Sequence, residues 1–268
     1  MPPLSNRFVE RTYSGGGWLV RINDGVAEVI INRPPLNLIT LEMRRDLGRI
    51  INELEQDGNV RVVIFEGSGD RAFSAGGDVT EFLNTTPTEL IDWGRTIEAV
   101  ENLSKPTIAL LRGYVLGAGT ELALACDIRI GTPDVEIGLP EIRLGMVPAS
   151  GGLTRIVKAL GGALRARYYL LLGRRIKAEE ALQLGLVHEV VDPAKIHDRV
   201  MEIARDLMSL SPLAIKALKE AIRLIQDSPM DVGFDIERKT FALLRYSQDF
   251  QEGIRAFKEK RQPKFQGL

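Results

Sequence analysis

The 268-residue chain has little cysteine or histidine and almost no net charge. Its single cysteine, Cys126, excludes an internal disulfide and a cysteine-based zinc site. The two histidines, His188 and His197, lie too far apart for a His-rich metal site, so we expect no metal. The 35 basic and 36 acidic side chains give a net charge of -1, which provides no field to attract nucleic acid or an anionic membrane.

Long hydrophobic runs are also lacking. The most apolar region, residues 107–130, is interrupted by Arg112, Glu121 and Asp127, and the N-terminus lacks the apolar core of a signal peptide. We therefore expect a cytoplasmic protein that does not associate with membranes. The content of 44% hydrophobic and 26% charged residues is typical of a globular chain that buries a large core without disulfides.

Strand-like and helix-like segments alternate in the first part of the chain. Residues 18–22 and 26–32 flank an Asn-Asp-Gly turn and predict a β-hairpin. Residues 41–54 have the apolar spacing of a helix, with Thr40 as its N-cap. Further helices are expected at 87–102, 119–125 and 178–182, and further strands at 61–65, 107–111, 127–131 and 186–191. This alternation predicts an α/β fold with parallel strands, built from repeated β, β, α units.

The end of the chain has a different pattern. After Asp192 nearly every segment is helical, with amphipathic helices expected at 196–209, 212–226 and 230–246. We therefore divide the chain into a core at 1–191 and a C-terminal helical region at 192–268. The helical region carries more apolar surface than a small appendage should leave exposed, so we expect it to mediate assembly.

Two glycine-containing turns each lead into a predicted helix. In residues 73–81, Asp78 can cap the helix and Glu81 can complete a capping box. Residues 113–121 form a similar turn after the strand 107–111. Free backbone N–H groups at a helix N-terminus stabilise negative charge that develops on an oxygen, so two such turns can form an oxyanion hole.

Two glutamates stand in unexpectedly apolar surroundings. Glu121 is the only charged residue between Arg112 and Asp127, so its burial would be costly without a partner or a purpose. Glu141 follows Pro140 and is again flanked by apolar residues. Both glutamates are candidates for a catalytic acid or base. The alternative for Glu141 is a first-turn residue that the helix dipole favours and that has no catalytic role.

Two local matches receive structural interpretations. Ser150 stands where a nucleophile elbow would place its serine, but Pro148 replaces the first glycine, and we interpret Ser150 as the N-cap of a helix that runs to Leu160. The stretch 67–72 fits a dinucleotide-binding string, but it does not open a helix.

Five ordered motifs resemble the crotonase superfamily, the enoyl-CoA hydratases and isomerases, from about residue 18 to the C-terminus. The motifs are Asn32-Arg-Pro34, Ala72-Phe-Ser-Ala-Gly-Gly-Asp78, residues 105–127, residues 140–152 and residues 256–261. The resemblance implies a crotonase-like spiral of ββα units. It also implies C-terminal helices that assemble a homotrimer, or a hexamer made of two trimers, since trimers of this family often pair.

The resemblance also implies roles for individual residues. The backbone N–H groups of Gly77 and Ala118 would form the oxyanion hole for an acyl-CoA thioester carbonyl. The family usually has glycine in place of Ala118, but a backbone amide acts there, so alanine suits the role if the turn does not require a positive φ. Glu121 and Glu141 fall on the two acid/base positions of the hydratases, whereas isomerases commonly keep only the later one.

Substrate contacts follow from the same resemblance. The CoA adenine is expected near the backbone of Leu38 and Ala75, with Lys260 near the nucleotide phosphates. Three apolar residues after the first turn line the acyl pocket or belong to ordinary helix packing: Phe82, Leu83 and Trp93.

The sequence thus predicts an enoyl-CoA hydratase of acyl-CoA metabolism. It would add water reversibly to the 2,3 double bond of a 2-enoyl-CoA thioester, or dehydrate a 3-hydroxyacyl-CoA, with CoA as part of the substrate and no other cofactor. Two related activities stay open. One is a double-bond isomerase that uses Glu141 alone. The other is a hydratase of alicyclic dienoyl-CoA thioesters, because the sequence of residues 33–37 resembles that of such hydratases. A non-catalytic RNA-binding or scaffolding protein with the same fold is the alternative of another class.

Overall fold

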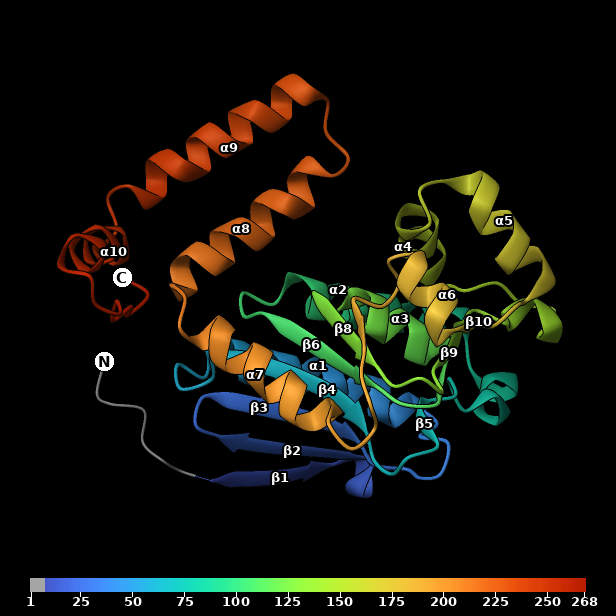
Figure 1. The fold of residues 1–268 in the computed structure, drawn as a ribbon. Helices are drawn as coiled ribbons and strands as arrows, with labels where there is room; N and C mark the ends of the chain where they lie inside the picture. Colours follow the sequence, from blue (N-terminus) through green and yellow to red (C-terminus); the bar gives the residue numbers. More distant parts are fainter. Residues whose placement is uncertain (1–7) are drawn as a thin grey trace.

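The larger of two β-sheets forms the base of the fold in the computed structural model, which describes residues 8–268 (Figure 1). Its seven strands have the order β1-β2-β3-β4-β6-β8-β11. The first three pair antiparallel, and β3 to β11 pair parallel. The strands are β1 (Val9–Tyr13), β2 (Trp18–Asn23), β3 (Val26–Ile31), β4 (Val62–Gly67), β6 (Thr107–Leu111), β8 (Ile128–Gly131) and β11 (Glu189–Val190).

The smaller sheet has four strands in the order β10-β9-β7-β5. They are β5 (Ala72–Ser74), β7 (Tyr114–Leu116), β9 (Glu136–Gly138) and β10 (Ile176–Lys177). The chain alternates between the sheets, because β4 is followed by β5, β6 by β7 and β8 by β9, and a helical segment follows each pair. The predicted α/β fold of repeated β, β, α units is therefore confirmed.

Helices α1 to α6 and three short 3-10 segments connect these strands. They are α1 (Leu41–Gln56), α2 (Pro87–Asn102), α3 (Ala118–Ala125), α4 (Gly152–Ala159), α5 (Ala163–Leu172), α6 (Ala178–Gln183), η1 (Ser14–Gly16), η2 (Val79–Asn84) and η3 (Glu141–Leu144). The predicted cap of α1 is confirmed, because the Thr40 hydroxyl accepts a hydrogen bond from the Met43 N–H at 3.2 Å.

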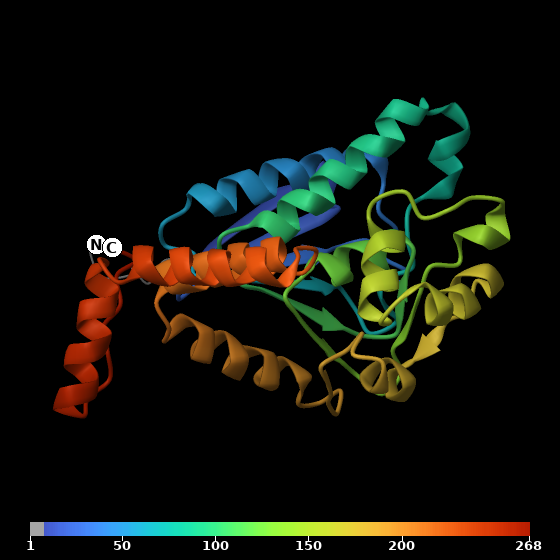
Figure 2. The ribbon, with the colours of Figure 1, turned by 90° about the horizontal axis from the view of Figure 1, so that it is seen from above.

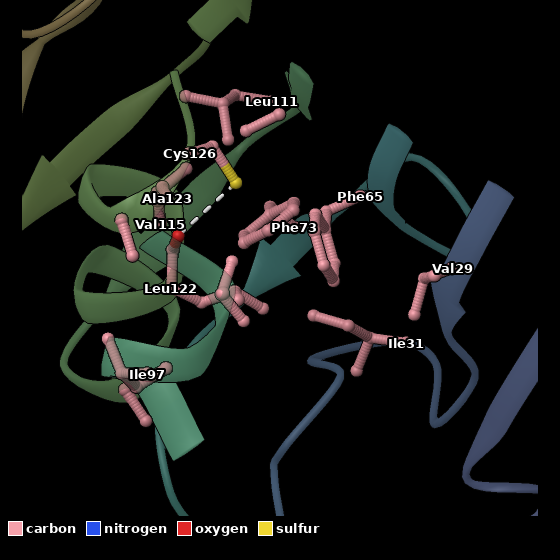
Figure 3. Close-up of a cluster of buried hydrophobic side chains, with 14 of the residues drawn as sticks. Val29, Ile31, Phe65, Phe73, Ile97, Leu111, Val115, Leu122, Ala123 and Cys126 are labelled. Carbon is pink, nitrogen blue, oxygen red and sulfur yellow. Dashed lines mark hydrogen bonds between the residues drawn. The ribbon is translucent and has the colours of Figure 1, made fainter. Parts of the chain in front are cut away.

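Strand β4 shows how the sheet divides the core. Its side chains alternate between the two faces: Val63 and Phe65 join one buried cluster, and Val62 and Ile64 join another. The first cluster lies between the larger sheet and helices that include α2 and α3, and Figure 3 shows part of it. There the Cys126 Sγ lies 3.4 Å from the Leu122 carbonyl oxygen, and burial raises the pKa of this thiol to about 12.

Four helices complete the chain: α7 (Ile196–Met208), α8 (Pro212–Ile225), α9 (Met230–Leu244) and α10 (Gln248–Glu259). Helix α7 packs on the larger sheet through Ile196, Val200 and Ala204. In contrast, α8, α9 and α10 rise above the sheets (Figure 1), and α8 is joined to the sheet region through Lys219, which bonds Asp127 and the Lys105 carbonyl oxygen. The division at residue 191 stays a prediction, and the apolar face of α7 belongs to a buried cluster of the larger sheet.

A helix that crosses a bilayer needs about 20 consecutive, mostly apolar residues. Within residues 8–268, none combines the length and the apolar character that a membrane crossing requires.

Candidate active site

The two glycine turns meet where β5 and β7 end side by side. Gly76 and Gly117 both have a positive φ, 116° and 52°, which favours glycine. Their backbones touch, since a Cβ on Gly117 would lie 3.6 Å from the Gly76 Cα and one on Gly76 would lie 3.3 Å from the Leu116 carbonyl oxygen. Ala118 follows as the first residue of α3, so the positive φ that would exclude alanine falls on its neighbour instead.

Two backbone N–H groups at this junction are free. The strip 36–39 pairs with 75–78 through Ala75 N–H to Leu36 O at 2.8 Å and through both backbone groups of Ile39. Gly77 donates no hydrogen bond in this ladder, and Ala118 begins a helix, so within residues 8–268 neither N–H has an acceptor. These are the donors that sequence reasoning proposed for an oxyanion hole.

The expected capping box at the first turn does not form as predicted. The Asp78 side chain does cap η2, with the Thr80 N–H at 3.4 Å. Glu81, however, accepts a hydrogen bond from the N–H of Leu41 at 2.7 Å. Its carboxylate therefore caps the start of α1, and the η2 turn is tied to that helix.

Glu121 lies in the first turn of α3 and is only 4% exposed. Both of its carboxylate oxygens accept a hydrogen bond: Oε1 from the Ser150 N–H at 2.9 Å and Oε2 from the Trp93 Nε1 at 3.2 Å. A Cβ on Gly152 would lie 2.7 Å from the Glu121 Cγ, so the chain closes tightly over this side chain. These two hydrogen bonds replace some of those that the carboxylate loses from water, so they offset the cost of its burial. They also hold the carboxylate in one orientation.

The interpretation of Ser150 as a helix N-cap is wrong. Helix α4 starts at Gly152, and its N-cap is Gly151, whose φ of 85° suits glycine. Ser150 acts instead through its backbone N–H on Glu121. Side-chain type gave no signal for this contact, because the donor is main chain.

Glu141 opens the short 3-10 segment η3 directly across from the second turn. A Cβ on Gly117 would lie 3.3 Å from the Glu141 Oε1, and within residues 8–268 the buried Oε2 has no hydrogen-bond partner. Burial, with the charge of Glu121 as a smaller contribution, raises the pKa of Glu141 to about 7. The carboxyl group is thus poised to hold or release a proton near neutral pH.

One cavity of ≈ 280 Å³ joins these groups. Its lining includes Gly77, Ala118, Glu121 and Glu141, together with the segment 146–150. A cavity of this size holds an acyl group but not a whole CoA ester, which would have to extend out of it.

The candidate acyl-pocket residues are placed differently from one another. Phe82 lines the cavity. Trp93 is 1% exposed and lies behind the wall, where it packs in the core and bonds Glu121. Leu83 is 91% exposed and is not part of the lining, which corrects its assignment, because its side chain projects from η2 into solvent.

The predicted CoA contacts are also separated by the fold. Ala75 lines the cavity, and Leu38 lies on the backbone strip paired with it, where its carbonyl accepts from Arg33 Nη1 at 3.1 Å. Lys260 caps the end of α10, at the opposite side of the molecule from α3 (Figures 1 and 2). Within one chain Lys260 therefore does not reach the site, and such a contact would have to come from another copy.

Arg44 is a cavity residue that the sequence analysis missed. It lies on α1, is 8% exposed and has its guanidinium carbon 5.1 Å from the ring centre of Phe82 and 5.2 Å from that of Trp93. Burial lowers the pKa of Arg44, and the charges of Glu121 and Glu81 partly offset this effect. A signal was present, because Arg44 stands three residues before Leu47 on the apolar face of the helix.

Comparison with known proteins places this geometry in a family. A family model for enoyl-CoA hydratase/isomerase matches residues 21–268. The chain belongs to this family, within the crotonase superfamily.

Several enzymes that act on CoA esters are similar to this chain in sequence or in structure. The short-chain-enoyl-CoA hydratase of Clostridium acetobutylicum is 35% identical over 241 residues, which is 88% of this chain and 92% of that one. The carnitinyl-CoA dehydratase of Escherichia coli strain K12 is 36% identical over 253 residues, 91% of this chain and 96% of that one. The crystal structure of an enoyl-CoA hydratase from Bacillus anthracis superposes with a TM-score of 0.89 at 34% identity and covers 94% of this chain and 100% of that chain. The crotonase-like fold is thereby shown, and an acyl-CoA substrate is consistent with the family.

Proposed function

We propose that the protein is an enoyl-CoA hydratase that adds water reversibly to the 2,3 double bond of a 2-enoyl-CoA thioester. The observation that carries the proposal is that two glutamates and two free backbone N–H groups border one small cavity. A double-bond isomerase of this family needs one of these carboxylates, whereas addition of water employs both. CoA belongs to the substrate, and the chemistry requires no further cofactor.

The thioester carbonyl oxygen would lie between the N–H groups of Gly77 and Ala118. Both donors are held by the backbone, so they need not reorganise as negative charge develops on that oxygen. Electron withdrawal by the hole makes C3 of the enoyl group electrophilic. Addition of water at C3 gives an enolate-like species with negative charge on the thioester oxygen. The two N–H groups stabilise this charged oxygen more than the neutral carbonyl of the ground state.

The two glutamates have different environments and different proposed roles. Glu121, whose oxygens already accept from Ser150 and Trp93, binds a water molecule and takes its proton as the hydroxyl group bonds to C3. Glu141, with a pKa raised to about 7, delivers its proton to C2. The pair starts and ends with one proton, which returns from Glu121 to Glu141 before the next turnover.

The test is loss of crotonyl-CoA absorbance with the purified protein and its Glu121→Gln variant. We expect hydration by the unaltered protein and a loss of about 10²- to 10⁴-fold in the variant. Glu42→Gln is the matched control, because Glu42 is exposed on α1. Full hydration activity of Glu121→Gln would refute the role given to Glu121. Conversion of a 3-enoyl-CoA to its 2-enoyl isomer without hydration of crotonyl-CoA would replace this proposal with the isomerase.

We further propose that the protein assembles as a homotrimer, or as a pair of trimers, through its C-terminal helices. The support is that α8 and α9 leave the sheets and expose large apolar side chains, among them Leu218, Ile222, Phe241 and Leu243. Light scattering at micromolar concentration should give a multiple of three chains. A stable monomer would contradict this assembly.

A further inference from the structure

Arg44 presents a buried positive charge without a bound partner. Its Nε is fully buried and unpaired, and among the side chains that the structure describes its guanidinium has no hydrogen-bond or ion-pair partner. An arginine stays charged in proteins, so leaving it unpaired in an apolar setting is costly. The two aromatic rings of Phe82 and Trp93 offset only part of that cost.

The neighbouring acids are committed elsewhere. Glu121 uses one oxygen for Ser150 and the other for Trp93, and Glu81 bonds the N–H of Leu41. Neither carboxylate forms an ion pair with the Arg44 guanidinium, although both act on it through their charge. The guanidinium is therefore held near the cavity by packing, and its hydrogen-bonding capacity is left for a ligand.

The place of Arg44 relates it to the acyl group. Its Nη2 occupies the space that a Cβ on Gly77 would need, so it lies beside the predicted oxyanion hole. Among the described residues it is the only basic side chain in the cavity lining, which otherwise carries the carboxyl groups of Glu121 and Glu141. The Glu121 carboxylate alone would repel an anionic acyl chain, and the positive charge of Arg44 opposes that effect at one wall.

We propose that Arg44 is a specificity-determining residue that binds a carboxylate at the far end of a short acyl chain, so that the preferred substrate is a carboxylate-bearing enoyl-CoA. This inference rests on the proposed hydratase and names its substrate class. The planar guanidinium donates two parallel hydrogen bonds to a carboxylate, a geometry that an uncharged alkyl chain cannot use. The ≈ 280 Å³ cavity restricts the acyl chain to a short one.

Binding of unreactive esters tests the inference without relying on turnover. Glutaryl-CoA is compared by calorimetry with 5-methylhexanoyl-CoA, in which an isopropyl group of the same shape replaces the carboxylate. We expect the unaltered protein to bind glutaryl-CoA about 10- to 100-fold more tightly, the range of a charge-assisted hydrogen bond. Arg44→Met should abolish the preference, Arg44→Lys should keep part of it, and Arg45→Met, on the exposed side of α1, should leave it unchanged.

Turnover provides the second measurement, with glutaconyl-CoA and 5-methylhex-2-enoyl-CoA as the matched pair. The unaltered protein should favour glutaconyl-CoA in kcat/KM, and Arg44→Met should lose activity on that substrate only. Equal binding of the two saturated esters, or an equal loss on both substrates in Arg44→Met, overturns the inference; an equal loss would assign Arg44 to the orientation of Glu121. If neither enoyl ester is hydrated while the binding preference holds, the hydratase proposal fails and the carboxylate site stands.

Discussion

Glu141 should make the protein less stable while it makes the reaction possible. Replacement by glutamine keeps the shape of the side chain and removes its charge. The rise in its pKa from 4.5 to about 7 corresponds to about 3 kcal/mol, because each pKa unit is worth about 1.36 kcal/mol. Partial exposure to water reduces this figure to about 2 kcal/mol. Glu141→Gln should therefore be inactive and yet harder to unfold.

The gain in stability should depend on pH in a defined direction. Below about pH 4.5 the carboxyl group is protonated in both the folded and the unfolded chain, so it costs nothing. Between about pH 4.5 and pH 7 the unfolded chain releases this proton first, and stability falls as the pH rises. Above about pH 7 the full cost is present. The advantage of Glu141→Gln should grow across this window and then level off.

Urea unfolding at one fixed protein concentration, from about pH 5 to about pH 8, measures this difference. Glu42→Gln on the exposed side of α1 is the control and should show no such growth. An advantage of Glu141→Gln that is the same at every pH would mean that burial does not raise the pKa of Glu141. A variant less stable than the unaltered protein above about pH 7 would refute the reasoning outright.

Two further variants examine the donors of the site. Ala118→Pro removes an N–H at the first position of α3, where proline is well tolerated, so turnover should fall about 10²- to 10³-fold with little change in the melting temperature. Ala118→Gly keeps the donor and should turn over close to the unaltered rate, and a normal rate for Ala118→Pro would remove this amide from the hole. Trp93→Phe keeps an aromatic ring in the core but deletes the donor to Glu121, so we expect about a tenfold lower hydration rate. An unchanged rate would show that the carboxylate is oriented without Trp93.

Elements with strong periodicity were predictable from the sequence. The helix at 87–102 and the strand at 107–111 have the boundaries that the pattern predicts. Helix α1 starts at the predicted residue and ends at Gln56, close to the predicted end at residue 54. Short strands were not predictable in the same way. The three-residue strand β9 (Glu136–Gly138) is too short to show a period of two, and it exists because β7 and β10 pair with it. The strand predicted at 186–191 is also shorter in the structure, because only Glu189 and Val190 pair with the neighbouring strand β8.

The sequence predicted only some of the site residues, because some of them act through their side chains and others through a backbone N–H. Glu121 stood out as a charge in an apolar helix, and the fold brings it to the same cavity as Glu141, 20 positions later. The Ser150 N–H could not be foreseen, since any residue but proline carries it. Lys260 was assigned by resemblance, and only the three-dimensional placement of α10 shows that one chain cannot bring it to its own cavity.

The contact between the Ser150 N–H and Glu121 has a consequence for how this enzyme family diversifies. Residues 146–150 form a wall of the cavity, so changes there would be the direct way to admit a different acyl group. The same segment ends on the amide that orients Glu121. A substitution that shifts the main chain at residue 150 would thus also turn the carboxylate, so a new substrate is best admitted by changes to the side chains of residues 146–149 that leave this main chain in place.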